Sequence, residues 1–270
     1  MKNTIGLMLM VIAIFVPCSS LAITFGGPLE VKNQFPIFLP INQPYLEMAA
    51  TENSFSLSLS HSSVFVIEDS SHWSTHLDIE LTELNFRYRR DFPGLFEVGV
   101  DLPVLRATQG FMDRPLAWYH RTFGFQDYGR STRPDNTFLY DVRKDGSPLI
   151  EGINDRVGFG DARLTFKKKV IGTDPVVSLM ADVELPTGNA RIGYGSGSVD
   201  AGIAVLLDKD LGPDSRLYAN LGAVSPGDLK AYQTVKLDDF YYAGIGIEAL
   251  VLPHLSLLGQ LMVQTSPYPH

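Results

Sequence analysis

The sequence predicts an all-β protein, an antiparallel transmembrane β-barrel, on three observations. The first is the alternation in residues 177–185, where Val177, Leu179 and three further apolar residues alternate with residues that include Asp182 and Glu184. Successive side chains of a strand point to opposite faces, so one face of this strand meets an apolar medium and the other a polar one. The second observation is that the same alternation recurs along the chain, and the third is a secretion signal at its start. Outer-membrane barrels combine these features.

Residues 1–22 predict a cleavable signal peptide. Lys2 gives a basic start, residues 5–16 are continuously apolar, and Ser20-Leu21-Ala22 provides the small residues that a signal peptidase recognises. The apolar stretch is too short to span a bilayer as a helix. We therefore expect export to the outer membrane of a Gram-negative cell. An alternative makes Cys18, the only cysteine, a lipid-modified first residue, but Pro17 replaces the small residue that such a site needs.

The charge balance bears on the partners of the chain. The formal net charge is -8, and the longest cationic run is Lys167-Lys168-Lys169. Because binding to a phosphate backbone needs several clustered cations, nucleic acid is not expected as a partner. No cofactor-binding motif is predicted either.

The periodicity divides the chain into a lead-in and a barrel. Residues 23–52 contain four prolines and predict an extended periplasmic segment, and the barrel is expected at residues 53–270. Inside the barrel, residues 106–157 predict a long external loop in which Asp113 could cap a short helix that ends at Gly124. Nine strands are predicted, at residues 54–66, 84–89 (the end of the second), 96–102, 160–170, 177–185, 198–207, 217–223, 241–249 and 255–263.

The connections support this assignment. Short turns at residues 91–94, 172–175, 209–214 and 252–254 alternate with longer connections, as periplasmic turns alternate with external loops in such barrels. Bacterial barrels normally close with an even number of strands, whereas the sequence stops in residues 266–270 as if another loop began there. We therefore expect that C-terminal strands are missing and that the complete barrel has about 12 strands.

Charged residues occupy the face of these strands that is opposite to the apolar one. Opposed charges in a barrel lumen either lock it with salt bridges or line an aqueous path, and the sequence leaves both alternatives open. The candidate lumen-lining residues are Arg87, Arg89, Glu97, Asp101, Arg163, Lys167, Asp182, Glu184, Arg216 and Glu248.

A glycine-rich run at residues 193–197 resembles both a phosphate-binding loop and the turn around a serine nucleophile. Both motifs need a following helix, whereas the chain from Ser198 onward alternates as a strand. The run therefore predicts a flexible external loop. No nucleophile can be paired with a base, so we do not expect an enzyme, although a membrane-embedded hydrolase remains an alternative.

Three histidines, His61, His72 and His76, lie near Glu68 and Asp69 in the first external connection. They could ligate a metal ion, but the serines and threonine around them give no support for the helix that would bring His72 and His76 together. A hydrophilic loop with scattered histidines is the simpler interpretation, so no metal site is predicted.

Several segments carry a family resemblance. The segments Gly27–Gln34, Phe96–Leu105, Arg133–Asn136 and Gly158–Leu164 resemble an uncharacterised Gram-negative family, the domain of unknown function 3187. Two others, Leu185–Gly188 and Gly195–Asp200, are similar to barrels of the phenol meta-cleavage pathway type. The resemblance implies an outer-membrane barrel and favours passage of small apolar molecules, but it transfers no catalytic or ligand-binding residue.

The expected function is that of a passive channel or ligand-admitting barrel for small compounds, apolar ones included. Outer-membrane lipid and a small apolar solute are the expected partners. A non-conducting structural barrel and a secreted soluble β-protein are the alternatives. On this face assignment Val183→Arg should be costly, whereas Asp182→Val should be tolerated.

Overall fold

The computed structural model describes residues 25–252 and 255–268. The predicted signal peptide, residues 1–22, lies outside the described residues. Within the described part, no helix is long and apolar enough to cross a membrane.

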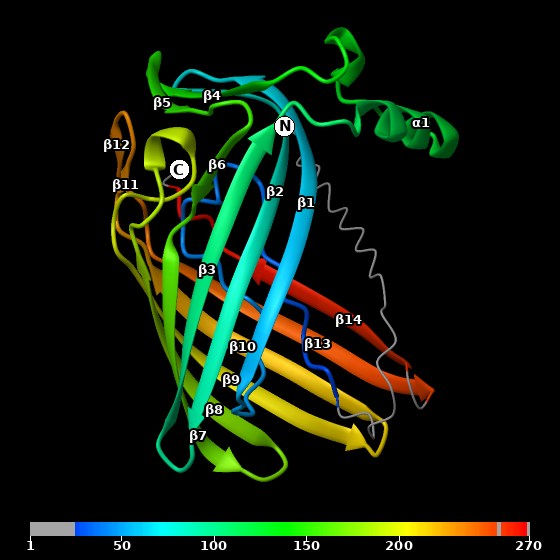
Figure 1. Cartoon of the computed structure of the whole chain (residues 1–270), viewed down its shortest axis with the longest axis vertical. Helices are drawn as coiled ribbons and strands as arrows, with labels where there is room; N and C mark the ends of the chain where they lie inside the picture. Colours follow the sequence, from blue (N-terminus) through cyan, green and yellow to red (C-terminus); the bar gives the residue numbers. More distant parts are fainter. Residues whose placement is uncertain (1–24, 253–254, 269–270) are drawn as a thin grey trace.

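Nine long antiparallel strands form one strongly curved sheet (Figure 1). Each pairs with its neighbours in the sheet, in the order β1, β2, β3, β7, β8, β9, β10, β13, β14. All nine predicted strands are confirmed, and several are longer than predicted. Their bounds are Ser54–Asp69 (β1), Trp73–Phe92 (β2), Phe96–Thr108 (β3), Ala162–Gly172 (β7), Val176–Leu185 (β8), Asp200–Gly212 (β9), Ser215–Ser225 (β10), Phe240–Leu252 (β13) and Leu255–Gln264 (β14).

The two faces of the sheet have the opposite polarity to those of a sheet in a water-soluble protein. In β8, Leu179 on the convex face is 51% exposed, whereas Ser178 and Asp182 on the concave face are buried. In β2, Phe86 and Tyr88 are exposed on the convex face. Apolar side chains thus face outward and polar ones inward, which is the arrangement of a membrane barrel rather than of a water-soluble sheet. The predicted register of β8 is confirmed.

The connections divide the sheet into two ends. Short turns join β2 to β3, β7 to β8 and β9 to β10 at the end drawn lowest in Figure 1, which we call the turn end, and the predicted turn at residues 252–254 lies partly outside the described residues. The long connections, and the short one between β1 and β2, lie at the opposite end, which we call the loop end.

The predicted long loop at residues 106–157 contains more regular structure than expected. It holds the helix α1 (Asp113–Phe123), the 3-10 turn η1 (Arg130–Thr132) and the strands β4 (Leu139–Lys144), β5 (Ser147–Glu151) and β6 (Arg156–Phe159). β4 pairs with β2 and β6 pairs with β3, so both extend the wall at the loop end. Apolar residues are adjacent in β4 (Leu139 and Tyr140) and in β5 (Leu149 and Ile150), so neither strand shows the alternation that predicts a strand. The dipeptide Asp145-Gly146 is a local sequence signal for the hairpin of β4 and β5. Both residues have positive φ, as the two-residue turn of a tight hairpin requires.

The helix α1 confirms one predicted end and corrects the other. Gly124 ends it in the left-handed conformation, with φ at 73°. Asp113, however, does not cap the helix, because Met112 occupies the N-cap position. The carboxylate of Asp113 instead pairs with Arg130 and accepts the N–H of Asn136 at 2.6 Å, so it fixes the loop rather than the helix.

The two edges of the sheet are β1 and β14, and among the described residues they do not pair with each other. Residues of the N-terminal segment contact both edges. The N–H of Leu29 donates to Oε1 of Gln260 on β14 at 2.9 Å, and Oγ of Ser56 on β1 donates to Glu30 at 2.8 Å. These contacts bridge the open side of the sheet.

An apolar core closes the concave side at the loop end. Leu77, Ile79 and Leu81 of β2 are buried there. The hairpin of β11 (Leu229–Lys230) and β12 (Thr234–Val235) and the 3-10 turn η2 (Ala190–Ile192) contribute further buried side chains.

The glycine-rich run at residues 193–197 also packs into this end, so the expected flexible loop is wrong. Tyr194 is buried, and the carboxylate of Asp161 accepts the N–H groups of Gly188 and Ser196, both at 2.7 Å. A Cβ at Gly195 would lie only 2.4 Å from Oδ1 of Asp161. The glycine is needed because the chain wraps closely around this carboxylate.

Candidate functional site in the lumen

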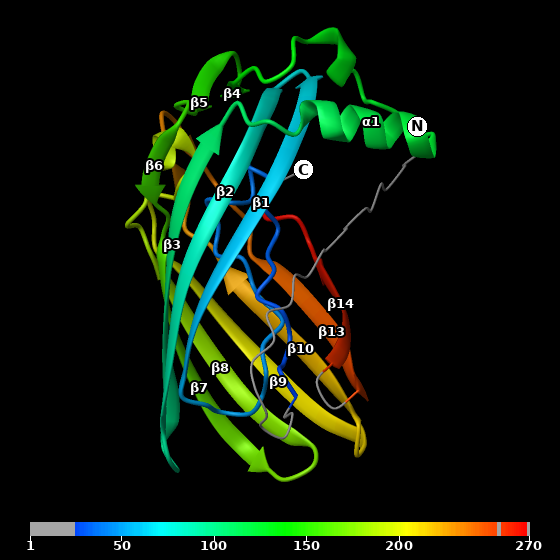
Figure 2. The ribbon, with the colours of Figure 1, turned by 45° about the vertical axis from the view of Figure 1, so that its right-hand side comes forward.

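Residues 25–53, which we call the lumenal segment, fill the space enclosed by the sheet (Figure 2). The segment starts beside Glu248 near the turn end and turns at residues 36–41, where Tyr268 donates to the carbonyl of Ile37 at 2.5 Å. It then returns to the turn end and enters β1. We expected a periplasmic lead-in here, but the described part of the segment lies along the concave face.

Carboxylates of the wall hold the main chain of the lumenal segment. Each of four wall residues accepts at least one main-chain N–H group from it, and N–H donation to an ionised acceptor is among the stronger hydrogen bonds in proteins. The pairs are Gly26 and Gly27 with Glu248 (3.0 and 3.1 Å), Asn42 with Asp200 (3.0 Å), Ala49 and Ala50 with Asp208 (2.9 and 2.8 Å), and Glu52 with Glu97 (2.8 Å).

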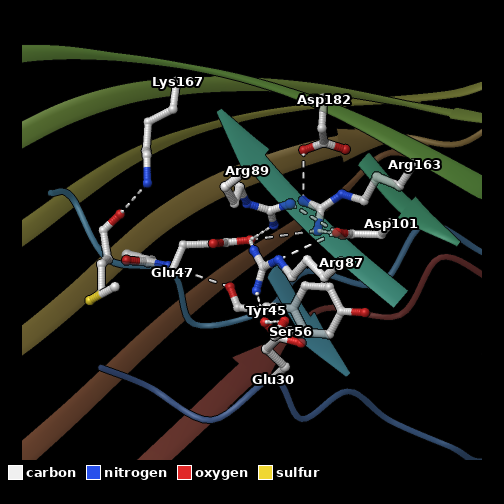
Figure 3. A network of polar contacts seen from close by, with 12 residues as sticks. Glu30, Tyr45, Glu47, Ser56, Arg87, Arg89, Asp101, Arg163, Lys167 and Asp182 are labelled. Atoms are coloured by element: carbon white, nitrogen blue, oxygen red, sulfur yellow. Dashed lines mark hydrogen bonds and ion pairs between the residues drawn. The ribbon is translucent and has the colours of Figure 1, made fainter. Parts of the chain in front are cut away.

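Glu47 of the lumenal segment lies at the centre of a buried ion network (Figure 3). Its carboxylate pairs with Arg87, lies 3.5 Å from Arg89 and lies 3.9 Å from Arg163. The network continues to Asp101, which lies 2.9 Å from Nη1 of Arg89. Two strands of the wall, β2 and β7, thus share one carboxylate of the segment, and Asp101 of β3 pairs with the same arginines.

Tyr45 packs beneath the same network. The guanidinium groups of Arg87 and Arg163 lie 5.1 and 5.5 Å from the centre of its ring. Both distances are within the range of a cation–π interaction. The segment therefore contributes an anion and an aromatic face to the same two arginines.

Lys167 of β7 makes a second set of contacts with the segment. Its ammonium group pairs with Glu97 at 3.0 Å and donates to the carbonyls of Met48 and Ala50 at 3.2 and 2.8 Å. These three contacts use every donor of the Lys167 ammonium group inside the lumen. Asp182 of β8 pairs with Arg163 at 3.0 Å.

The electrostatic environment keeps the segment charged. Burial alone raises the pKa of the Glu47 carboxyl, but the guanidinium groups of Arg87 and Arg163 outweigh burial and hold this pKa below its ordinary value. Burial lowers the pKa of Lys32, but the ion pair with Glu83, together with other acidic groups nearby, raises this pKa by more, so it lies above its ordinary value. Both groups are ionised at neutral pH.

The ten candidate residues all lie on the concave side, but they do not form one group. Seven of them join the network around Glu47: Arg87, Arg89, Glu97, Asp101, Arg163, Lys167 and Asp182.

The other three candidates lie apart from that network. Glu184 is half-buried and lies in register between Arg163 and Asp200. Glu248 holds the start of the segment. Arg216 lies near the turn end, where it pairs with Asp210 at 2.7 Å. That these residues line a solute path stays a prediction.

Sequence reasoning missed the residues of the segment itself and two carboxylates of β9. Asp200 and Asp208 lie on the concave face of β9, so the strand period already predicted their orientation. Glu30, Lys32 and Glu47 lie in a stretch without a period, where nothing distinguishes a lumenal residue from a periplasmic one.

The three histidines bind different partners. His61 lies 2.9 Å from Glu80, His72 lies 2.8 Å from Asp145, and His76 lies 3.1 Å from Asp69. Within residues 25–252 and 255–268, no group of three metal-ligating side chains comes together.

Comparison with known proteins identifies a family but no curated relative. No curated protein matches the chain. Among solved structures, the chain is similar to the crystal structure of the COG4313 outer membrane channel from Pseudomonas putida F1, with 14% identity, a TM-score of 0.49, and coverage of 82% of this chain and 75% of that chain. The family described as "Protein of unknown function (DUF3187)" matches residues 5–269, and the chain therefore belongs to the DUF3187 family.

Proposed function

We propose that this protein is an outer-membrane channel for small solutes, apolar ones included, and that its lumenal segment closes it. The main observation in support of this proposal is that ion pairs and hydrogen bonds to the wall hold the segment in the lumen. Such contacts can be exchanged for contacts with water, so the same wall can exist with its lumen filled or open.

The inverted polarity of the sheet supports a membrane location. On β1, β2 and β3 three successive rows of convex-face residues are apolar, and the last of them joins Leu59, Leu84 and Val104. A secreted soluble β-protein would turn such rows into a core, and a soluble monomer rarely exposes so large an apolar patch. The proposed contact of this face is the hydrocarbon of the bilayer.

The charges of the wall support a path for ions once the segment leaves. Buried carboxylates of the concave face outnumber buried cations, so an open lumen would attract cations. The carboxylates are Glu83, Glu97, Asp101, Asp182, Asp200, Asp208 and Glu248, and the cations are Arg87, Arg89, Arg163 and Lys167.

The loop end supports the passage of apolar compounds. Its concave side is lined by apolar residues such as Ile79, Leu81 and Ile150, against which Ile41 of the segment packs. A compound that follows the path of the segment would thus meet an apolar zone beyond the charged one. This zone is the basis for including apolar solutes in the proposal.

A non-conducting structural barrel is the second candidate, and the ion network around Glu47 favours it. Buried pairs of this kind fix a conformation, and removal of one partner costs about 3–5 kcal/mol. A segment held so firmly would act as a permanent core. The two candidates differ in whether the segment can leave the lumen of a folded protein.

Conductance in planar bilayers separates the two candidates. The whole protein is compared with a variant that lacks residues 28–50 and with the double variant Glu47→Ala/Asp208→Ala, and folding is checked by the heat-dependent mobility shift on gels. We expect low conductance for the whole protein and higher, cation-preferring conductance for folded variants. Glu68→Gln, which changes an exposed carboxylate of β1, is the matched control and should behave as the whole protein does.

Two results would contradict the proposal. Folded variants that remain closed would establish the structural barrel instead. Equally high conductance of the whole protein and the variants would show that the segment does not close the lumen.

A further inference from the structure

We propose that α1 and its flanking aromatic residues, residues 111–128, lie on the phosphate-bearing lipid surface at the loop end and anchor the barrel there. We call these residues the aromatic loop. The inference rests on the membrane location proposed above, and it adds a lipid-binding surface outside the lumen.

The aromatic loop exposes four large aromatic side chains to a considerable extent. Phe111, Trp118, Phe123 and Tyr128 are 68%, 62%, 61% and 77% exposed. α1 extends sideways from the loop end, beyond β1, in both views (Figure 1 and Figure 2). Clustered exposed apolar side chains are uncommon on the surfaces of soluble proteins, whereas aromatic residues are frequent at the two membrane interfaces.

The helix is amphipathic. Leu116, Tyr119 and Phe123 share one side, because residues three and four apart lie on the same face of a helix. The rings of Tyr119 and Phe123 lie 4.9 Å apart, and Phe125 lies 5.5 Å from Tyr119, so these residues form one aromatic cluster. A helix with such a face binds at the boundary between headgroups and acyl chains.

The exposed charges of α1 are complementary to a phosphate surface. Asp113 is buried against Arg130, so the exposed charges of the helix are Arg114, which pairs with Asp135 at 3.1 Å, and Arg121. Trp118 lies between these two arginines, on the side of the helix opposite to Leu116, Tyr119 and Phe123. Arginine carries its charge on a long apolar stem, which lets it reach headgroup phosphates from a helix embedded near them.

The aromatic loop is attached where the apolar rows of the sheet end. Above the row of Leu59 and Leu84, the next convex-face row contains His61 and Thr82. The ring of Phe111 stacks on His61 with the ring centres 5.6 Å apart.

Hydrogen bonds fix this attachment. Oε1 of Glu80 accepts the N–H of Phe111 at 2.8 Å and that of Met112 at 2.5 Å. The loop therefore begins at the polar border of the apolar rows. This is the height at which an interfacial helix would lie.

Fluorescence quenching by lipids tests the inference. The protein has two tryptophans, which Trp73→Phe/Trp118→Phe removes, and Phe123→Trp in this background places the only tryptophan on the aromatic side of α1. This variant is reconstituted in phosphatidylcholine vesicles, with and without phosphatidylglycerol, that carry bromine near the glycerol end of the acyl chains. We expect strong quenching of Phe123→Trp, and we expect Arg114→Gln/Arg121→Gln to reduce it in the vesicles with phosphatidylglycerol.

Two single-tryptophan controls, made in a Trp73→Phe/Trp118→Phe background, give the scale. Tyr232→Trp places the reporter on an exposed residue at the loop end, outside the aromatic loop, and should not be quenched. Leu179→Trp places it on the convex face and should be quenched by bromine deeper in the chains.

The controls separate the possible failures. If Leu179→Trp is quenched and Phe123→Trp is not, the lipid contact of the aromatic loop is overturned while the membrane location stands. If neither is quenched, both proposals are overturned. Quenching of Phe123→Trp that is no stronger than that of Tyr232→Trp also overturns the inference.

Discussion

The main-chain N–H of Ala49 donates to Oδ1 of Asp208 at 2.9 Å, although 159 residues separate them along the chain. Asp208 also accepts the N–H of Ala50, so one wall carboxylate satisfies two adjacent donors of the lumenal segment. A buried main-chain N–H must be paired inside the protein, and the segment has no neighbouring strand to pair with. The wall carboxylates take that role.

Removal of the Asp208 carboxylate should therefore release the returning part of the lumenal segment. Asp208→Ala removes two hydrogen bonds to a charged acceptor, each worth about 1.5–3 kcal/mol. We expect amide hydrogen exchange at Ala49 and Ala50 to accelerate by at least about tenfold while exchange in β9 changes little. Glu68→Gln is the control, and unchanged exchange in Asp208→Ala would show that the carboxylate does not hold the segment.

A charge on the convex face should destabilise the barrel. Leu179 is half exposed on β8, and Leu179→Arg should cost about 2–4 kcal/mol if it lies near the bilayer midplane. The matched change Glu68→Arg, on an exposed polar residue of β1, should cost less than about 1 kcal/mol. Urea unfolding in lipid vesicles measures both. Equal tolerance of the two changes would mean that the convex face does not contact hydrocarbon.

Asp182→Val should also be destabilising, which revises the tolerance expected from the sequence. Asp182 pairs with Arg163 and accepts the side-chain amide of Asn42, so its removal leaves a buried guanidinium without its closest anion. The expected cost is about 3–5 kcal/mol in the same urea experiment. The double variant Asp182→Val/Arg163→Met removes both charges and should recover part of this loss. No recovery would mean that the two side chains do not act as a pair.

The contact between Glu47 and the arginines should resist mild acid. The folded-state pKa of Glu47 is lowered below its ordinary value of 4.5, so its stabilising effect is complete above that pH and is lost as the pH falls through the folded-state pKa. The part of the protease protection that depends on Glu47, taken as the difference between the parent protein and Glu47→Gln, should thus be unchanged between about pH 7 and about pH 5 and decrease only below that range. A decrease of this difference above about pH 5 would contradict this assignment.

The alternation of residues such as Leu179 and Asp182 was enough to predict nine strands, their faces and the inward orientation of the candidate residues. It could not predict β4 and β5, in which apolar residues are adjacent rather than alternating with polar ones. Nor could it place Glu47, because position inside a lumen leaves no periodic signature when the chain is held by wall side chains. The ion network depends on contacts between Glu47 and residues about 40 to 116 positions away, which only the folded sheet brings together.

Thiol labelling at Ala49 tests most directly whether the lumenal segment closes the barrel. In a Cys18→Ser background, Ala49→Cys places the only thiol at a fully buried position of the segment, and Ser54→Cys places one at the half-buried start of β1. In the protein reconstituted in lipid vesicles, we expect a bulky maleimide to label Cys at 54 readily and Cys at 49 at least about a hundredfold more slowly, since labelling at 49 requires the segment to leave the wall. Addition of Asp208→Ala and Glu47→Ala should bring labelling at 49 close to that at 54. Equally fast labelling at both positions in the otherwise unchanged protein would contradict a closed lumen.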